Sequence, residues 1–449
     1  MRGDLGMNLI TKADIERLRK RIERIEGGRM EPLRGPDPAT SVEDPEDPFG
    51  PFEAPERYDA EKCLDGVVLE NPHGSYFLAE RFYPHHKLHG GYEISRLADM
   101  PGDWLTGVSK GEIPAHDPSR WVFLDTETTG LAGGTGTCAF LIGVGTIEPD
   151  GFRVRLFFMR DYDEEAAMLY GLAEFLAGYD VLVTYNGKSY DAPLIETRYR
   201  LRRQRYPLER MHHLDLLHGA RSLWKLRMAS CRLMHLEYEI LGVERHGDLP
   251  GELIPHYYFE YLRTKQAFRL VPLFHHNVID IVSLACLTGV VLPAYADPQS
   301  AALHHGADLL GLARWLKRAG DVENAAALYR RSVEAGMVDN ELFAALWETA
   351  LIEKKRGRHD EKAAILADLA SSRNPYRAKA CEELAKHCER VEKNFQRALE
   401  LTLQAAQIEP SSALEKRRIR LEKRLEKTAK LGSSLAFHRS SVNRDTGHG

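Results

Sequence analysis

An apolar run that ends in two acids is the feature that most constrains how this chain can fold. Residues 121–128 read WVFLDTET, so four apolar residues lead directly into Asp125, Thr126 and Glu127. In a strand, side chains at i and i+2 lie on one face, which places Asp125 and Glu127 together and Thr126 on the other side. Two neighbouring carboxylates repel each other unless a cation neutralises them, and their hard oxygens suit Mg²⁺ or Mn²⁺. The alternative is an ordinary strand end that faces solvent.

The segments around this run predict a mixed α/β domain over residues 120–296. They follow the order strand, strand, strand, helix, strand, and helices dominate afterwards. The strands are expected at 121–125, 138–148, 152–160 and 180–186, with a helix at 163–178. The uncharged run at 281–296 is shorter than the roughly 20 residues of a membrane span, so it predicts a buried helix and no membrane.

The N-terminal part predicts little buried structure. Residues 1–61 combine a short amphipathic helix near 11–25 with a linker rich in Pro and acids. Residues 62–119 are expected to form a small strand-containing part of the α/β region, because two β-prone runs flank a turn sequence at 71–74.

The C-terminal part, 302–432, predicts helices without strands. Ala325, Ala363 and Ala398 recur at steps near the roughly 34-residue period of the tetratricopeptide repeat, which this segment resembles. An ordinary helical bundle is the alternative. Residues 433–449 are expected to be a disordered tail. Stacked repeats present concave surfaces, so a protein partner is expected there.

Composition limits the class of protein. The chain has 449 residues, 28% of them charged, and a formal net charge of −5, so attraction to nucleic acid requires local basic patches. Its six cysteines have no metal-binding or disulfide-like spacing, and the N-terminus lacks the apolar core of a signal peptide. These features predict a cytoplasmic protein with reduced thiols.

Two further acids occupy positions that suggest chemistry. Asp191 follows the polar turn NGKSY and begins a predicted helix, where a helix-capping role is the alternative. Asp280 lies in FHHNVIDIVSLACL, which we interpret as the head of an apolar helix. A carboxylate there is costly unless it faces a cleft or a partner.

The three segments DTETTG, NGKSYD and HHNVID resemble, in this order, the motifs of the DEDD superfamily of 3′-to-5′ exonucleases, which have a ribonuclease H-like fold. With LDLLHGARSLW and GDLPGELIP, they resemble more narrowly the bacterial YprB-like ribonuclease H-like group, whose members can carry a tetratricopeptide tail. The resemblance covers roughly residues 62–292 well.

This resemblance implies a phosphodiester hydrolase with two Mg²⁺ or Mn²⁺ ions. Asp125 would hold both ions, Glu127 and Asp280 would complete one, and Asp191 would hold the other. Bound divalent ions lower the pKa of a water and stabilise charge on the phosphate.

The resemblance also implies a general base before the last acid, and this chain has His275 and His276 at the two possible offsets from Asp280. An imidazole titrates near neutral pH and can accept a proton from water. The superfamily spacing favours His275, with His276 as the alternative. Both could instead pack on the helix.

Other residues near the motifs are candidates for contact with nucleic acid. Arginines interleaved with tyrosines after the second motif could pair with phosphates and stack on bases, although a solvated helix face explains them equally well. The loop at 130–137 lacks the ending of a P-loop and is expected to lie beside the metal site. The candidates are Thr128, Asn186, Tyr190, Arg198, Arg202 and Arg203.

Two other functions fit the same pattern less well. A nuclease-like domain could bind nucleic acid or a partner without cutting, and an endonuclease could share the fold. The presence of all four acids favours the exonuclease over the first, and their spacing favours it over the second.

Overall fold

The computed structural model describes residues 56–130, 136–245 and 247–442, with the backbone alone for 339 and 429–442. All of them belong to one compact unit, Ala54–Gly449. The helix predicted near 11–25 and most of the predicted loop at 130–137 lie outside the described residues.

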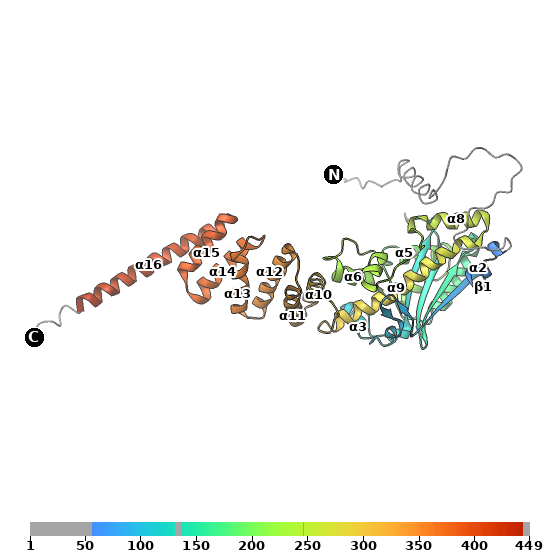
Figure 1. Cartoon of the computed structure of the whole chain (residues 1–449), viewed down its shortest axis with the longest axis horizontal. Helices are drawn as coiled ribbons and strands as arrows, with labels where there is room; N and C mark the ends of the chain where they lie inside the picture. Colours follow the sequence, from blue (N-terminus) through green and yellow to red (C-terminus); the bar gives the residue numbers. More distant parts are fainter. Residues whose placement is uncertain (1–55, 131–135, 246, 443–449) are drawn as a thin grey trace, which may run out of the picture. The chain divides into compact units, whose positions relative to one another are not determined.

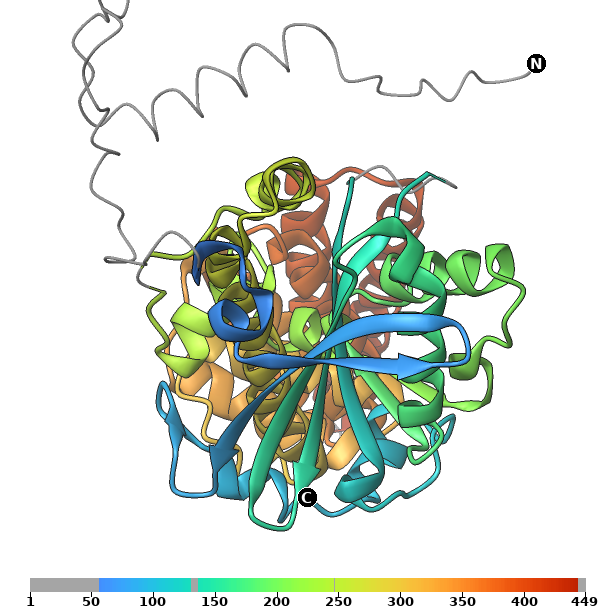
Figure 2. The ribbon, with the colours of Figure 1, turned by 90° about the vertical axis from the view of Figure 1, so that its right-hand side faces the viewer.

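Seven strands form one mixed, twisted sheet in the order β1-β2-β7-β6-β5-β8-β9 (Figures 1 and 2). The strands of this sheet are β1 (Gly66–Asn71), β2 (Gly74–Pro84), β5 (Trp121–Thr128), β6 (Ala139–Glu148), β7 (Gly151–Phe158), β8 (Val181–Thr184) and β9 (His212–Asp215). A separate hairpin pairs β3 (Leu88–His89) with β4 (Tyr92–Glu93).

Helices flank this sheet, as the sequence predicted. In chain order they are α2 (Ala60–Leu64), α3 (Trp104–Val108), α4 (Glu165–Leu176), α5 (Asp191–Leu201), α6 (Leu216–Trp224), α7 (Leu233–Leu236), α8 (Ile254–Thr264) and α9 (Val271–Ala296). The predicted strand order and the hairpin turn at 71–74 are confirmed, since Asn71 pairs with Gly74.

Three strands align their carboxyl ends at one edge of the sheet. β5 pairs in parallel with β8, and β8 with β9. The edge where parallel strands end is where α/β folds commonly place ligand sites. Strand β9 was not among the strands expected from the sequence; pairing with β8, with Thr184 opposite Asp215, makes HHLD a strand.

Both faces of the sheet are covered. The adjacent residues Tyr76 and Phe77 point to opposite sides, as in any strand. A Cβ on Gly171 of α4 would meet the Tyr76 ring, whereas the Phe77 ring lies 6.3 Å from that of Phe274 on α9. Coverage on both sides explains why nine of the ten residues of β6 are buried.

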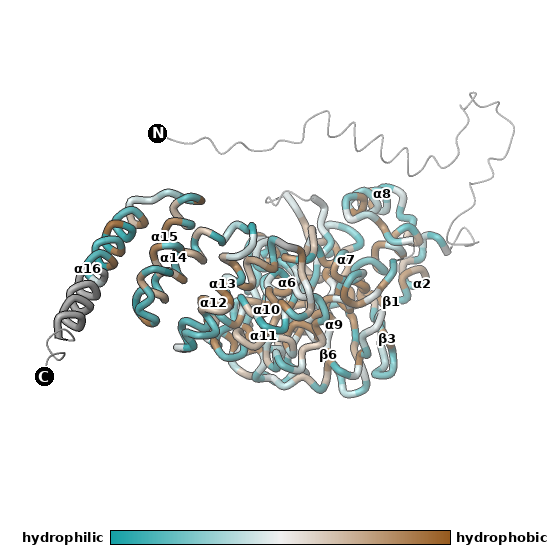
Figure 3. The backbone as a smooth tube through the Cα atoms, turned by 60° about the vertical axis from the view of Figure 1, so that its left-hand side comes forward, coloured by the Kyte–Doolittle hydropathy of each residue, from teal (hydrophilic) through white to brown (hydrophobic). Residues whose placement is uncertain are grey.

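Helix α9 is the long apolar helix that packs on β5, β6 and β7 (Figure 3). With the short turn before it, the segment Ala267–Ala296 is long and apolar enough to cross a membrane, but 72% of its most apolar window is buried inside the protein. The expectation of a buried helix is confirmed. Asp280 lies in the interior of α9 and not at its head, because the helix begins at Val271.

Two glycines on β6 let α9 approach the sheet closely. A Cβ on Gly143 would lie 1.9 Å from Oδ1 of Asn277, and a Cβ on Gly145 would lie 2.5 Å from a methyl carbon of Ile281. Heavy atoms cannot approach this closely, so only glycine fits at these positions without displacement. The pair of glycines therefore sets how near α9 lies to β5 and β6.

The remaining helices form an all-α region, which confirms the predicted fold class. They are α10 (Gly306–Ala319), α11 (Val322–Glu334), α12 (Asp339–Lys355), α13 (His359–Ser371), α14 (Arg377–His387), α15 (Phe395–Ile408) and α16 (Ser412–Val442). Their identity as tetratricopeptide repeats stays a prediction. Helix α16 continues through Gly432, so the chain keeps helical backbone where a tail was predicted to begin.

The buried apolar residues form two clusters. The first joins the sheet and its helices to α10 and α11, and extends to Ile352 of α12. The second runs from Ala350 of α12 to Leu421 of α16. A polar contact supports the first connection, because Arg227, just after α6, donates to buried Asp308 of α10 at 2.9 Å.

We predict that Gly143→Ala destabilises the protein by about 1 to 3 kcal/mol, because the new methyl group must displace Asn277 or α9. Thermal and urea unfolding of both proteins would measure the loss. Gly251→Ala is the matched control, since a Cβ there meets no atom within 4 Å. Equal stability of Gly143→Ala and the wild type would contradict the close approach.

Candidate metal centre

The two acids of β5 lie on one face of the strand, against α9. Asn277 of α9 donates from Nδ2 to Oδ2 of Asp125 at 3.0 Å and to Oε1 of Glu127 at 3.4 Å. One amide thus bridges both carboxylates, as expected for residues at i and i+2. Asn277 is fully buried, and the sequence interpretation did not assign it a role.

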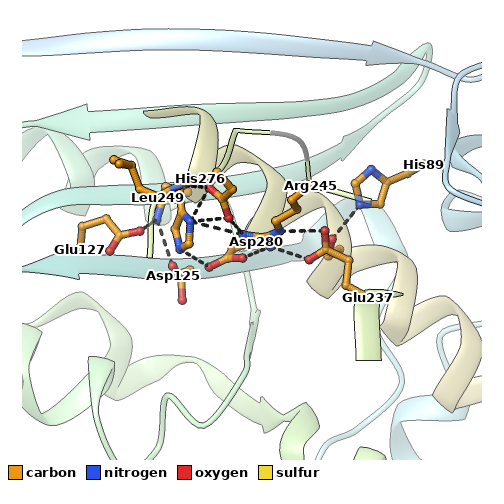
Figure 4. A network of polar contacts seen from close by, with 11 residues as sticks. His89, Asp125, Glu127, Glu237, Arg245, Leu249, His276 and Asp280 are labelled. Carbon is orange, nitrogen blue, oxygen red and sulfur yellow. Dashed lines mark hydrogen bonds and ion pairs between the residues drawn. The ribbon is translucent and has the colours of Figure 1, made fainter. Parts of the chain in front are cut away.

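Helix α9 adds a histidine and an acid to the same place (Figure 4). His276 and Asp280 are separated by four residues and so lie on one face of the helix. Nε2 of His276 lies 3.5 Å from Oδ2 of Asp280. Ligand atoms of Glu127, His276 and Asp280 all lie within 4.8 Å of one another. Across the residues described, no other group of three such side chains is this close.

The structure places His275, the histidine that the superfamily spacing favoured, away from the carboxylates. His275 is exposed and lines a small pocket on another side of α9, together with Arg81 and Tyr83 of β2. A step of five residues along a helix turns a side chain well away from Asp280, whereas a step of four returns it to the same face. His276 is therefore the histidine beside the carboxylates.

A second carboxylate orients His276. Nδ1 of His276 lies 2.8 Å from Oδ1 of Asp248. With a proton on Nδ1 shared with Asp248, Nε2 is left facing Asp280 and the β5 acids. Asp248 lies in the GDLPGELIP segment, which the sequence interpretation quoted for resemblance alone.

Arg245 is a buried cation that the sequence interpretation missed. It donates to Oε1 of Glu237 at 2.9 Å, to Oδ2 of Asp248 at 2.9 Å, and to Oδ1 of Asp280 (Figure 4). Its side chain is only 8% exposed and that of Glu237 only 1%. The contacts span up to 35 residues of sequence, so no local pattern could reveal them.

Asp191 approaches from the other side of β5. It begins α5 and accepts a hydrogen bond of 2.5 Å from the Thr126 hydroxyl. Thr126 was predicted to face away from Asp125 and Glu127, and this contact agrees with that. Asp191 and Asp125 both lie outside the close group formed by Glu127, His276 and Asp280.

Three of the candidates for nucleic-acid contact, Thr128, Asn186 and Tyr190, lie at or shortly after the carboxyl ends of β5 and β8. The Thr128 hydroxyl donates to the carbonyl of Gly130 at 3.0 Å, and Tyr190, 64% exposed, precedes α5. Asn186 has a positive φ of 67°, and its backbone N–H donates to Asp215. Arg203 is exposed.

Arg198 and Arg202, two of the predicted phosphate contacts, both pair with a carboxylate of the protein. Nη2 of Arg198 donates to Glu165 at 2.8 Å, and Arg202 pairs with the same carboxylate. Glu165 is 1% exposed, so both arginines neutralise a buried charge on α4. The partner lies 33 residues before Arg198, beyond the reach of any local pattern.

The carboxylates are held where their negative charge is unfavourable. Burial, with the charges of Asp280 and Asp191, raises the pKa of Asp125 well above its usual range. Burial likewise raises the pKa of Glu127 to about 7 and that of Asp191 to about 6. Among the described side chains, none forms an ion pair with these three acids. A hard divalent cation fits this donor set.

The pKa of His276 is raised as well, but here the raised pKa favours the charged form. Burial alone lowers its pKa, but the hydrogen bond to Asp248 and the charges of Asp280 and Glu127 outweigh burial and raise the pKa to about 9. In the metal-free protein the imidazole is therefore protonated at neutral pH. A divalent cation beside it favours the neutral form, because like charges repel.

Comparison with known proteins gives the family. A family model described as the RNase_H superfamily matches residues 122–291. The uncharacterized protein YprB of Bacillus subtilis (strain 168) is 32% identical over 329 residues, which cover 72% of this chain and 78% of that protein. The chain belongs to the YprB family. The family and the ribonuclease H-like fold predicted from the motifs are thus confirmed.

One solved structure adds only a distant likeness. The family B DNA polymerase from the hyperthermophilic archaeon Pyrobaculum calidifontis matches 45% of this chain with a TM-score of 0.31 and 18% identity. The match spans 30% of that polymerase. At this TM-score the likeness carries no argument about the function of this YprB-family chain.

We predict that Glu127→Gln stabilises the metal-free protein at pH 8. The folded protein keeps the Glu127 proton up to about pH 7, whereas the unfolded chain releases it near its ordinary value of 4.5. Stability is therefore lost as pH rises between these values, by an amount on the order of 1–3 kcal/mol. Glutamine has no charge to bury and avoids this loss.

Thermal unfolding in EDTA at pH 5 and pH 8 tests this. The two proteins should differ little at pH 5, and the variant should unfold at a higher temperature at pH 8. Mn²⁺ should then raise the unfolding temperature of the wild type alone. Glu426→Gln, at an exposed position on α16, is the control. A variant less stable than the wild type at pH 8 would show that Glu127 is stabilised by partners within the fold.

Proposed function

We propose that this chain is a divalent-metal-dependent nuclease of the DEDD type that hydrolyses phosphodiester bonds of DNA or RNA from the 3′ end. The observation that carries the proposal is the pair of acids at the end of β5, next to His276, for which the described residues supply no ion-pair partner. Burying such charges reduces stability, so the arrangement suits a bound cation. The reaction is assigned to the cytoplasm, in keeping with the six free cysteines.

The assignment of the cations to the acids follows the resemblance to the DEDD motifs. Asp125 would bind two Mg²⁺ or Mn²⁺ ions, with Glu127 and Asp280 completing one and Asp191 holding the other. Asp280 would use Oδ2, because Oδ1 accepts from Arg245. When bound, such ions activate water and offset charge that builds on the phosphate.

The protein's own groups supply the proton transfer. Nε2 of His276 would accept the proton of the attacking water, with Asp248 holding Nδ1. Arg245 would fix Asp248 and Asp280 through its two donor edges. Helices α10–α16 would recruit a protein partner, because they add surface without a further candidate metal group among the described residues.

Arg245 also favours a second function, that of a binding scaffold that does not cut. Its guanidinium already pairs with Asp280, so the last acid of the motif is neutralised by the protein itself. A scaffold would bind nucleic acid or a partner and have no need for metal ions. The following experiments separate the two functions.

We predict that the purified full chain shortens end-labelled DNA or RNA stepwise in the presence of Mn²⁺ or Mg²⁺. Asp125→Asn and Glu127→Gln should each reduce the rate by at least about 100-fold, because each removes a charge from the cation site. Gel-resolved cleavage of single- and double-stranded substrates would measure this. Asp150→Asn, in the exposed turn between β6 and β7, is the matched control.

The outcomes separate the functions. A folded wild type that binds no Mn²⁺ in calorimetry and leaves every substrate intact would overturn the nuclease in favour of the scaffold. Cleavage of closed circular DNA would replace the exonuclease by an endonuclease.

The two adjacent histidines offer a matched pair of variants. We predict that His276→Gln lowers kcat by roughly 100-fold and removes the pH dependence that the base imposes, because it takes away the nitrogen that faces the acids. His275→Gln should change kcat less than about threefold. Rates measured from pH 6 to pH 10 would show this. The reverse result would assign the base to His275.

A further inference from the structure

A pocket beside the carboxylate edge is lined by cations. It has a volume of about 650 Å³ and lies where the loop after β8 meets α6 and the segment that follows α6. Arg221, Lys225 and Arg232 line it, and all three are exposed. Among the residues that the structure describes, no Asp or Glu lines the pocket.

Arg221, Lys225 and Arg232 have no acidic partner among the described residues. Within the part of the chain that the structure describes, none of the three forms an ion pair, whereas Arg227, between Lys225 and Arg232, pairs with Asp308. Arg221 and Lys225 are also four residues apart on one helical turn, where like charges destabilise by a few tenths of a kcal/mol. An anion from outside the chain would relieve this repulsion.

The pocket is connected to the candidate metal centre through one loop. Asn186 lines the pocket, and Asp191, five residues later, is one of the motif acids. Asp215, at the end of β9, fixes this loop by accepting from the backbone N–H of Asn186 at 2.8 Å and of Lys188 at 3.2 Å. It also caps α6, the helix that carries Arg221.

The direction of the strands places the pocket and the acids at the same edge. β5, β8 and β9 run parallel, so Glu127, Asn186 and Asp215 all follow or lie at carboxyl ends that meet there. A polymer of phosphates that reaches the acids can thus continue over the cationic pocket. A single small anion would need only one of these cations.

We propose that this pocket binds the sugar-phosphate backbone of the single strand whose end is held at the acids, with Arg221, Lys225 and Arg232 each neutralising a phosphate. The position of the strand end at the acids rests on the proposed function. Binding of the strand rests on the pocket alone and needs neither a metal ion nor cleavage.

Binding can be measured without hydrolysis. The full chain with Glu127→Gln, in EDTA, would be titrated against a fluorescent single-stranded oligonucleotide at several salt concentrations. The added triple change Arg221→Gln, Lys225→Gln and Arg232→Gln should weaken binding at least about tenfold. It should also lower the slope of log affinity against log salt by about 2, because three phosphate contacts on a single strand contribute about 0.7 each.

A second triple variant provides a control of equal charge. Lys416→Gln, Lys423→Gln and Lys427→Gln remove three exposed cations from α16, and binding should not change. Thermal unfolding should show both triple variants folded, since each replaces exposed charges. Equal losses in both variants, or no loss in the pocket variant, would overturn the proposal.

Competition identifies the anion. Inorganic phosphate or a mononucleotide at concentrations near that of the oligonucleotide should not displace it, and polyglutamate of equal charge should compete poorly. Displacement by either would overturn the strand assignment. If the pocket variant loses binding while the chain with its acids intact cuts no substrate, strand binding by the pocket is supported and the nuclease function is overturned. If the wild type cleaves nucleic acid and the pocket variant binds and cuts normally, strand binding by the pocket is overturned and the nuclease function is supported.

Discussion

The close packing of α9 on β5 and β6 is the constraint on which the rest of the site depends. Gly143 and Gly145 leave the space that Asn277 and Ile281 fill. This contact carries the amide of Asn277 to both acids of β5, and it carries His276 and Asp280 to the same point. A larger residue on β6 would separate the two elements and so the two halves of the acidic group. The site is thus a property of an interface inside the fold, and no single segment contains it.

Charge balance around that interface is uneven. Arg245 lies among Glu237, Asp248 and Asp280, so this side of the site is neutralised by the protein. Among the described residues no Arg or Lys pairs with the β5 acids; the imidazolium of His276 offsets part of the Glu127 charge, but burial still raises the pKa of both acids. Arg245 thus neutralises acids on one side of the site, whereas the charges of the two β5 acids are not fully balanced. An incoming cation gains most at the β5 acids.

Much of the fold and the four acids could be read from local pattern. The strand predicted at 121–125, the hairpin turn at 71–74 and the shared face of Asp125 and Glu127 follow from residue pattern and from the two-residue repeat of a strand. Asp191 and Asp280 came from motif order. These signals are all contained within a few residues, which is why they could be predicted.

What could not be read depends on distant pairing. Nothing local shows that Glu165 neutralises Arg198 and Arg202, or that Arg245 pairs with Asp280. Strand β9 exists because β8 lies beside it. His276 is a different case, since a four-residue step on a helix would have selected it had Asp280 been placed inside α9 and not at its head.

The distribution of the buried apolar residues has a consequence for how the chain comes apart. The first apolar cluster does not end with α9 but continues through α10 and α11 into α12, where the second begins. Cooperative units follow continuous cores, because elements that share a core lose their packing together. A chain cut after residue 296 would therefore expose the α6 surface that α10 covers and leave Arg227 without Asp308. We therefore expect the smallest self-sufficient fragment that contains the seven-stranded sheet to extend to the end of α12, and partial unfolding of the chain to begin beyond that helix.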